Sequence, residues 1–327
     1  MIKKKLNKIL FIINSLFLLV MLVSYTVPFI HPTYLWQISL LGIIFPFILA
    51  INILFAIYWL FSWKKYFWAN LIIILCGMTH IDNIIANQKN KLPSKELNEI
   101  KVSKKHQFDQ LINIMTYNVR LFNQNENLNN KNIEKDIIEI IKDKNPNILC
   151  LQEFNLTYKT KEIFDFYNIK SSDDNKLQIF TKYDVLNEGF VVSINSCLYK
   201  DIILNDTIRV YNIHLQSNWV KTMKSSYLNR ANESKKIKDH IKSSPFPVIV
   251  CGDFNDTPIS FTYSTIKDNL ADAFKESGIG IGNSFVAVPS LRIDYILHNT
   301  KYKSYNYKKH KYELSDHFPI SCDILVP

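Results

Sequence analysis

The sequence predicts an α/β protein in which a sandwich of mixed β-sheets flanked by helices follows about three membrane-spanning helices. The first 86 of the 327 residues consist mainly of long apolar runs, whereas the remainder alternates short β-forming runs with helical patterns. Charge changes at the same point, because residues 1–90 carry seven lysines and one acid while residues 91–327 carry 32 basic and 28 acidic residues. The second part is only mildly basic, which does not indicate a strong electrostatic grip on nucleic acid.

Three apolar runs make up the predicted membrane region. Residues 9–30 have spanning length, which is about 20 residues. A cleavable signal peptide fits this run less well, because no small-residue cleavage site follows and a second apolar run begins almost at once. That second run, 35–61, has no charge, and the third, 66–85, is weaker because His80 and Asp82 lie near its end. We therefore expect residues 1–86 to form an anchor of about three helices.

The lysines predict the orientation of this anchor. Four of them precede the first run, and the pair Lys64–Lys65 separates the second run from the third. Lysines in short loops tend to remain in the cytoplasm. With three spans both groups would lie inside and the domain after residue 86 would be extracytoplasmic; with two spans that domain would face the cytoplasm.

A polar, lysine-rich stretch, 87–108, is predicted to be a linker to a domain formed by residues 109–327. The domain opens with a βαβ-like pattern: a strand at 111–119, a helix at 132–144 with isoleucines at helical spacing, and a strand at 147–153. Later patterns predict strands at 177–182, 189–194, 197–204, 207–215, 248–253, 292–298, 303–312 and 318–325, and helices at 225–243 and 262–268. The GIGIG stretch, 278–282, lacks the spacing of a dinucleotide fingerprint and is predicted to be a flexible loop.

The five cysteines form no C-x-x-C pair, so no zinc or redox motif is visible. Cys150 and Cys251 lie inside apolar strand-like runs, where they are expected to act as small buried hydrophobic residues.

Several predicted strands end in polar residues that a core strand does not need. These are Asn118, Glu153, His214, Asp253 with Asn255, Asp294, and Asp316 with His317. Because ligands bind where strand ends and their loops converge, we expect these side chains to meet at one edge of the sandwich.

Each of these residues also has a purely structural interpretation. Asn118 could form an Asx-turn, Glu153 could be a surface carboxylate, and His214 could be a satisfied structural histidine. Asp253 and Asn255 could shape the turn before Pro258, and Asp294 could pair with Arg292.

Two further motifs are incomplete. The D-x-N-D spacing is typical of a calcium loop, but the glycine and distal glutamate of such a loop are missing. Asp316 next to His317 fits a serine-hydrolase triad, but no G-x-S-x-G elbow is present.

As a set, two histidines, several carboxylates and two amides at apolar strand ends are typical of metal-assisted phosphoryl chemistry. Hard oxygen ligands such as Glu153 and Asp316 suit Mg²⁺ or Mn²⁺. A carboxylate can orient and deprotonate a water, and a histidine can stabilise charge that develops on phosphate oxygens. A second carboxylate behind that histidine fixes its tautomer.

The order of these motifs resembles the endonuclease/exonuclease/phosphatase superfamily. The matching stretches are Asn118, LQE ending at Glu153, His214-Leu215, GDFN at 252–255, RIDY around Asp294, and SDH ending at His317, within residues 111–323. That superfamily includes deoxyribonucleases, abasic-site endonucleases, inositol-polyphosphate phosphatases and neutral sphingomyelinases. Membrane spans ahead of the domain resemble a membrane-anchored bacterial branch, which implies an inner-membrane protein.

The resemblance implies a four-layer sandwich built from two sheets, and it implies a role for each matching residue. Asn118 and Glu153 would help to hold Mg²⁺, with Asp316 nearby. Asp253, helped by Asn255, would position and activate the water. His317, held by Asp294, would contact the scissile phosphate, and His214 would bind the phosphate or assist the leaving group. Arg230, on the helix after His214, is a further candidate for a phosphate contact.

One departure from the family pattern is visible. Members often carry an SKYP segment where this chain reads TKYD, with Thr181 and Asp184, so substrate contacts at that segment do not carry over.

The sequence thus predicts a membrane-anchored, Mg²⁺- or Mn²⁺-dependent phosphoesterase or phosphodiesterase that is nuclease-like and cleaves by direct attack of water. A lipid head-group phosphodiesterase, an inositol-phosphate phosphatase and a non-catalytic binding module are the alternatives. The expected partners are the lipid bilayer and a phosphodiester substrate, nucleic acid or phospholipid; the sequence indicates no protein partner.

Overall fold

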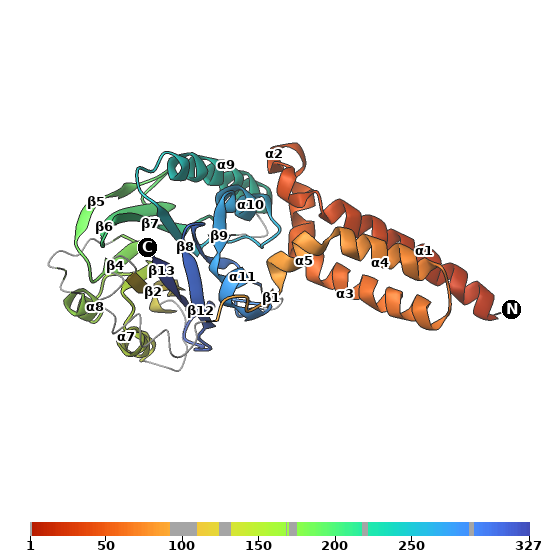
Figure 1. The fold of residues 1–327 in the computed structure, drawn as a ribbon, viewed down its shortest axis with the longest axis horizontal. Helices are drawn as coiled ribbons and strands as arrows, with labels where there is room; N and C mark the ends of the chain where they lie inside the picture. Colours follow the sequence, from red (N-terminus) through yellow and green to blue (C-terminus); the bar gives the residue numbers. More distant parts are fainter. Residues whose placement is uncertain are drawn as a thin grey trace.

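The computed structural model describes residues 2–91, 110–123, 132–167, 169, 175–217, 222–287 and 291–327. A helical projection carries the N terminus at its tip, and a β-rich domain occupies the other end of the molecule (Figure 1). The predicted α/β architecture with mixed sheets is confirmed.

Two sheets form the body of the domain. One has six strands in the order β5-β6-β7-β8-β11-β9, and the other has five in the order β12-β13-β2-β3-β4. The first comprises β5 (Val185–Phe190), β6 (Cys197–Ile203), β7 (Thr207–His214), β8 (Val248–Asp253), β11 (Asp294–Asn299) and β9 (Leu270–Asp272). The second comprises β12 (Lys303–Lys309), β13 (Ile320–Val326), β2 (Gln110–Asn118), β3 (Ile148–Gln152) and β4 (Gln178–Thr181). Both sheets are mixed, because β2 with β3 and β7 with β8 are parallel pairs among antiparallel ones.

Successive side chains of the central strands point to opposite faces of their sheet, and one of these faces forms the core between the two sheets. Ile114, Cys150 and Ile249 point into one inner cluster shared by both sheets. Their neighbours Met115 and Leu149 belong to a different cluster on the outer face of the five-stranded sheet. Because both faces of the central strands are buried, these strands consist of nearly continuous apolar runs rather than alternating ones.

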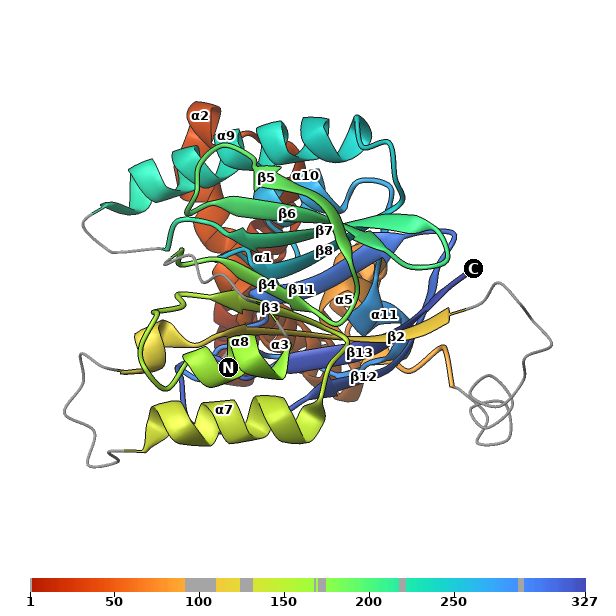
Figure 2. The ribbon, with the colours of Figure 1, turned by 90° about the vertical axis from the view of Figure 1, so that its left-hand side faces the viewer.

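Helices cover the two outer faces and complete the four layers. α7 (Ile133–Lys144) and α8 (Lys161–Phe166) pack on the five-stranded sheet through residues such as Ile137 and Phe164. α9 (Met223–Lys242) and α10 (Phe261–Lys267) pack on the six-stranded sheet through Ile237 and Tyr263. Figure 2 shows α7 and α9 on opposite sides of the paired sheets.

Some segments differ from their predictions. The strand predicted at 189–194 is β5, Val185–Phe190, because it pairs with β6 over that range and Val192 has a left-handed φ of 72°. The GIGIG stretch is not simply a loop, since Ile279–Gly280 forms β10 and pairs with β1 (Ala86–Asn87). The short elements α8, β9 and α11 (Ala273–Ser277) were not predicted, since elements of three to six residues carry too little periodicity.

The helical projection contains α1 (Ile2–Ser24), α3 (Ser39–Phe61), α4 (Tyr66–Cys76) and α5 (Met78–Ile84). Two stretches, Lys4–Phe29 and Pro32–Phe61, are long and apolar enough to cross a membrane. The third apolar run is not one straight helix, because α4 and α5 meet at an angle of 61°. The bend falls at Gly77, where a Cβ would lie 2.2 Å from the hydroxyl of Tyr25. Up to three spans result if the bent pair counts as one.

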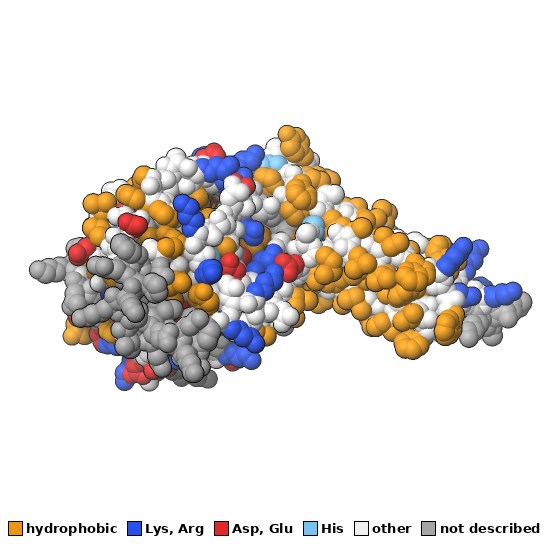
Figure 3. All heavy atoms as spheres, viewed as in Figure 1, with side chains coloured by type: hydrophobic (Ala, Val, Ile, Leu, Met, Phe, Trp, Pro, Cys, Tyr) orange, Lys and Arg blue, Asp and Glu red, His pale blue; other side chains and the backbone are white. Residues whose placement is uncertain are grey.

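Hydrophobic side chains cover the surface of this projection, and lysines cluster at its tip (Figure 3). The exposed apolar residues include Leu16, Leu54 and Ile72, which are 58–65% exposed. So much exposed apolar surface would be unfavourable in water, which is consistent with a lipid environment.

The first residues of the predicted linker are hydrogen-bonded to the β-rich domain. The amide of Gln88 donates to the carbonyl of Gly278 at 2.8 Å, and that of Asn90 donates to the carbonyl of Glu276 at 2.7 Å. The remainder of the predicted linker, 92–108, lies outside the described residues.

Candidate functional site

Strand register brings five of the predicted site residues to one edge of the sandwich. In the six-stranded sheet, Asp253 pairs with His214 on one side and with Asp294 on the other. In the five-stranded sheet, Asn118 ends β2 and Glu153 directly follows β3, its parallel neighbour. Each of these side chains therefore stands at or next to the first or last residue of a buried strand.

The backbone is in a left-handed conformation where the chain leaves these strands. Glu153 and Asn255 have φ of 49° and 52°, a conformation that residues other than glycine rarely adopt. Gly252 has φ of 128°, and a Cβ there would lie 2.0 Å from the carbonyl oxygen of Ile213. Only glycine allows β8 to approach β7 this closely immediately before Asp253.

Asp253 is the centre of the contacts within the site. Its side chain is completely buried and accepts hydrogen bonds from Asn118 Nδ2 at 3.1 Å and from Asn255 Nδ2 at 3.1 Å. The Nε2 atoms of His214 and His317 lie 3.8 and 3.7 Å from Asp253 Oδ2. Burial raises the pKa of Asp253 to about 7, an effect that the nearby His317 partly opposes. A carboxylate with such a pKa can accept a proton from water near neutral pH.

His317 is held by Asp294 as predicted, with Nδ1 2.8 Å from Asp294 Oδ2. Burial lowers the pKa of His317, but the carboxylates of Asp294 and Asp253 outweigh it and raise this pKa to about 10. His317 is therefore an imidazolium at neutral pH. Its ring also packs against Phe285, with ring centroids 5.2 Å apart.

His214 has the opposite character. Its Nε2 lies 3.5 Å from Glu153 Oε1, but burial lowers the pKa of His214 more than that carboxylate raises it. His214 is therefore neutral at neutral pH. The site presents one charged and one neutral imidazole on either side of the Asp253 carboxylate.

Asp316 stands at the rim of the site. Its Oδ2 lies 3.5 Å from Arg120 Nε, and its Oδ1 lies 4.0 Å from His317 Nε2. Arg120 was not among the predicted residues, although its position two residues after Asn118 in YNVR was a signal. The amide of Arg120 donates to Asn118 Oδ1 at 3.0 Å, which fixes the orientation of that amide side chain.

Sequence reasoning also missed three buried polar residues beneath the site. Gln152 donates to Asn212 across the two sheets at 2.6 Å, and Asn212 donates to the carbonyl of Leu151 at 2.7 Å. The hydroxyl of Ser284 accepts from the amide of Asp294 at 3.0 Å. These bonds tie together the strand ends that carry the site. The only signal for Gln152 and Asn212 was a polar residue inside an otherwise apolar strand.

The structure does not bring Arg230 to this cluster. Its side chain is completely buried, with Nε 3.4 Å from Asp256 Oδ2, and Nη1 donates to the carbonyl of Gln216 at 2.8 Å. These contacts hold α9 against the loops after β7 and β8, so a phosphate would have to displace them to reach the guanidinium. Asp256 also accepts from the amide of Thr257, as a turn-forming residue does. The alternative pairing of Asp294 with Arg292 is not formed either, because Arg292 pairs with Asp272.

Two groups of side chains could hold a cation. The ligand atoms of Asp253, Asp294 and His317 all lie within 4.8 Å of one another, and Asp294 Oδ1 is buried with no hydrogen-bond donor among the described residues. However, Asp294 Oδ2 and His317 Nδ1 already bond to each other. The partly exposed carboxylates of Glu153 and Asp316 are oxygen donors at the site edge, and the buried Asn118 lies beside Glu153, although its Oδ1 accepts from the Arg120 amide. This set fits a hard divalent ion better.

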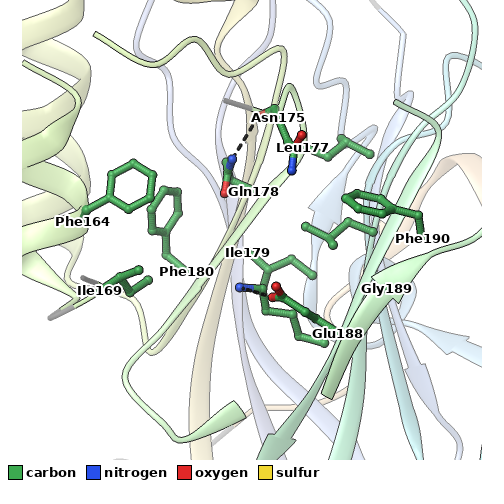
Figure 4. Close-up of a pocket in the computed structure, with 12 residues that line it drawn as sticks. Phe164, Ile169, Asn175, Leu177, Gln178, Ile179, Phe180, Glu188, Gly189 and Phe190 are labelled. Atoms are coloured by element: carbon green, nitrogen blue, oxygen red, sulfur yellow. Dashed lines mark hydrogen bonds and ion pairs between the residues drawn. The ribbon is translucent and has the colours of Figure 1, made fainter. Parts of the chain in front are cut away.

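A separate cavity of about 370 Å³ lies between β4 and the β5–β6 hairpin (Figure 4). Phe164, Phe180 and Phe190 line it, and its two charged residues, Glu188 and Lys200, form an ion pair with each other at 2.8 Å. None of the predicted site residues lines it.

Comparison with known families gives the class of the protein. The family model described as Endonuclease/Exonuclease/phosphatase family matches residues 115–317, which contain every predicted site residue. The chain belongs to this family, whose members are hydrolases of phosphoester bonds that generally use divalent metals. A second model, described as a domain of unknown function, matches residues 7–84. No curated protein matches the chain.

Solved structures share the fold of the domain. An endonuclease/exonuclease/phosphatase family protein from Bacteroides thetaiotaomicron has 16% identity and a TM-score of 0.50, and the match covers 67% of this chain and 99% of that one. The catalytic domain of human Nocturnin has 17% identity and a TM-score of 0.51, covering 66% and 95%. TDP2 from Caenorhabditis elegans has 16% identity and a TM-score of 0.53, covering 71% and 80%.

Proposed function

We propose that the protein is a membrane-anchored, metal-dependent phosphodiesterase that hydrolyses its substrate by direct attack of water. The observation that carries this proposal is the position of the buried Asp253 carboxylate between a charged and a neutral histidine, at 3.7 and 3.8 Å. A base, a cation and a neutral hydrogen-bonding group within one site are what hydrolysis of a phosphate ester requires.

Each residue has a role in this mechanism. Asp253, oriented by Asn255 and Asn118, takes the proton of the attacking water. His317, kept charged by Asp294, binds a non-bridging phosphate oxygen and stabilises the charge that develops on it. His214, being neutral, donates a hydrogen bond to the phosphate or to the leaving oxygen.

Glu153, Asp316 and Asn118 would hold the metal ion, and Mg²⁺ or Mn²⁺ suits their oxygen donors. A bound ion would neutralise charge on the phosphate and leaving-group oxygens. Arg120, 3.5 Å from Asp316, would keep that carboxylate oriented toward the site.

The membrane anchor is part of the proposal. Residues 1–86 would form the anchor, 87–108 the connection, and 109–327 the catalytic domain of a bacterial inner-membrane protein. The anchor's lysines, among them Lys4, Lys5, Lys64 and Lys65, lie at the start of α1 or join α3 to α4. Lysines cluster at the tip of the projection, at the end opposite the domain (Figure 3). This arrangement supports an extracytoplasmic catalytic domain, because lysine-rich loops remain in the cytoplasm.

Two substrate classes are compatible with the site. A nucleic acid is the first, and a phospholipid head group is the second. The attachment of the domain to the anchor, through contacts such as that of Asn83 with Pro258, favours the second, because it would hold the site near the bilayer surface.

The test is a hydrolysis screen with the full chain in lipid nanodiscs and added Mg²⁺ or Mn²⁺. DNA, RNA, sphingomyelin, phosphatidylinositol phosphates and a chromogenic bis-phosphodiester serve as substrates. We expect hydrolysis of at least one substrate, and Asp253→Asn and His317→Asn should each reduce it by about 10²–10⁴-fold. Full activity in Asp253→Asn would overturn the mechanism, and no activity on any substrate would leave the non-catalytic binding module as the better interpretation.

A further inference from the structure

The loop that follows Asp253 is seated on the membrane anchor. Ile259, six residues after Asp253, is 1% exposed and packs in a cluster of anchor side chains that includes Phe45 and Ile48 of α3. Thr257 lies against Gly42 of α3, where a Cβ would be 3.1 Å from Thr257 Oγ1. The absence of a side chain at Gly42 lets the helix and the loop approach this closely.

Asn83, at the end of α5, joins two segments of the candidate site. Its Nδ2 donates to the carbonyl of Pro258 at 3.3 Å, in the loop after Asp253. Its own carbonyl accepts from Arg292 Nη2 at 2.8 Å, two residues before Asp294. Its Oδ1 accepts from Lys275 Nζ at 2.9 Å, on α11.

Arg292 stabilises the contact between Asn83 and the domain. Its guanidinium is almost completely buried, pairs with Asp272 at 2.8 Å and stacks on Phe274, with 4.6 Å to the ring centroid. A buried guanidinium is stable only when its donors are satisfied, and the carbonyl of Asn83 satisfies one of them. Removing the anchor would leave this donor without a partner and would expose Ile259.

We propose that Asn83, together with Gly42, is a positioning residue of the active site. The anchor holds the loop after Asp253 and the start of β11, and so sets where Asp253 faces His317. The anchor is then a part of the catalytic unit as well as a membrane tether. This inference rests on the proposed function for its kinetic consequence, since a misplacement of about 1 Å at a catalytic group can cost about 10²-fold in rate.

Asn83→Asp tests the contact to the loop selectively. The aspartate keeps an acceptor for Lys275 but replaces the donor to Pro258 with an oxygen that repels its carbonyl. Lys275→Met is the matched control, because it removes the contacts of Lys275 with Asn83 and with Asp82, neither of which leads to the loop. Gly42→Val, which forces α3 away from Thr257, is an independent second variant.

The full chain is compared in lipid nanodiscs with the substrate and metal identified by the hydrolysis screen. We expect Asn83→Asp and Gly42→Val to lower kcat by about ten- to hundredfold with little change in KM, and Lys275→Met to leave kcat within about twofold of the unaltered chain. Thermal unfolding of Asn83→Asp and Lys275→Met should be similar, which separates positioning from a general loss of stability.

Amide hydrogen exchange of residues 254–259 gives a readout that needs no activity. Exchange should be faster in Asn83→Asp and Gly42→Val, and unchanged in Lys275→Met. Equal effects of Asn83→Asp and Lys275→Met on kcat and exchange, or no effect of either, would overturn the inference. If the unaltered chain hydrolyses nothing, the proposed function fails while the exchange measurement still decides the role of Asn83.

Discussion

The Asp294 carboxylate lies 2.8 Å from His317 Nδ1, although the two residues are 23 positions apart in the chain. Asp294 begins β11 in the six-stranded sheet, and His317 precedes β13 in the five-stranded sheet. This contact therefore joins the two sheets at the site edge. It also gives His317 its charge, and it leads to the first prediction.

Asp294→Asn should change the pH dependence of hydrolysis. Burial lowers the pKa of His317, and the Asp294 carboxylate is the largest of the effects that raise it to about 10. Without that charge the pKa falls, so the imidazolium is lost as pH rises above neutral. We expect kcat/KM of the variant to decline on the alkaline side of neutrality, where the unaltered enzyme stays active. Identical dependence of kcat/KM on pH in Asp294→Asn and the unaltered enzyme, from pH 6 to 10, would contradict the proposed charge on His317.

Removal of the metal should abolish hydrolysis reversibly. Chelation with EDTA is expected to remove activity, and Mg²⁺ or Mn²⁺ should restore it, because Glu153 and Asp316 offer hard oxygen ligands. Glu153→Gln should raise the Mg²⁺ concentration needed for half-maximal activity by about tenfold or more. The matched control is Glu188→Gln, which alters a carboxylate in the cavity of Figure 4. Full activity in EDTA would refute metal dependence.

Gly252→Ala should destabilise the domain strongly. A Cβ at this position would lie 2.0 Å from the backbone oxygen of Ile213, so β7 and β8 would have to separate. We expect a loss of about 3–5 kcal/mol in the free energy of unfolding, from backbone strain and overpacking together. Gly280→Ala is the control, because Gly280 also has a positive φ, of 78°, but nothing lies within 4 Å of its added Cβ. Thermal unfolding that shifts equally in both variants would contradict this account.

Asn70→Leu should weaken the anchor. Asn14 and Asn70 exchange two side-chain hydrogen bonds of 2.9 Å, and Trp59 Nε1 donates to Asn14 at 2.7 Å. These bonds join α1, α3 and α4, and hydrogen bonds between membrane helices contribute about 1–2 kcal/mol. Unfolding in detergent should occur earlier in Asn70→Leu than in Ile72→Ala, since Ile72 faces outward and is 58% exposed. Earlier unfolding of Ile72→Ala than of Asn70→Leu would show that these hydrogen bonds do not help to hold α4 in place.

The domain should lie outside the cytoplasm. A reporter enzyme that is active only outside the cytoplasm, fused after residue 105, is expected to be active. The same reporter fused between α3 and α4, next to Lys64, should be inactive. An inactive reporter after residue 105 would show that the bent pair of α4 and α5 does not span the membrane.

Much of the fold could be predicted because its strands and long helices have strong local patterns. VIVCGD and NILCLQ are recognisable as buried strands, and the isoleucines of α7 recur at helical spacing. The limits of β5 could not be predicted, because pairing with β6 and the left-handed Val192 decide them. The bend at Gly77 depends on the distant Tyr25, which no local pattern contains.

The chain order of chemically distinctive residues determined the candidate site and the family. The types of side chain at the strand ends, and the apolar strands before them, could be read directly. Only the tertiary structure decided their electrostatic states, since burial keeps His214 neutral whereas neighbouring carboxylates keep His317 charged. It also decided that Arg230 is a buried structural residue and that Asn83 touches the loop after Asp253. The contact of Asn83 with Pro258 joins positions 175 residues apart, and no pattern of local spacing encodes it.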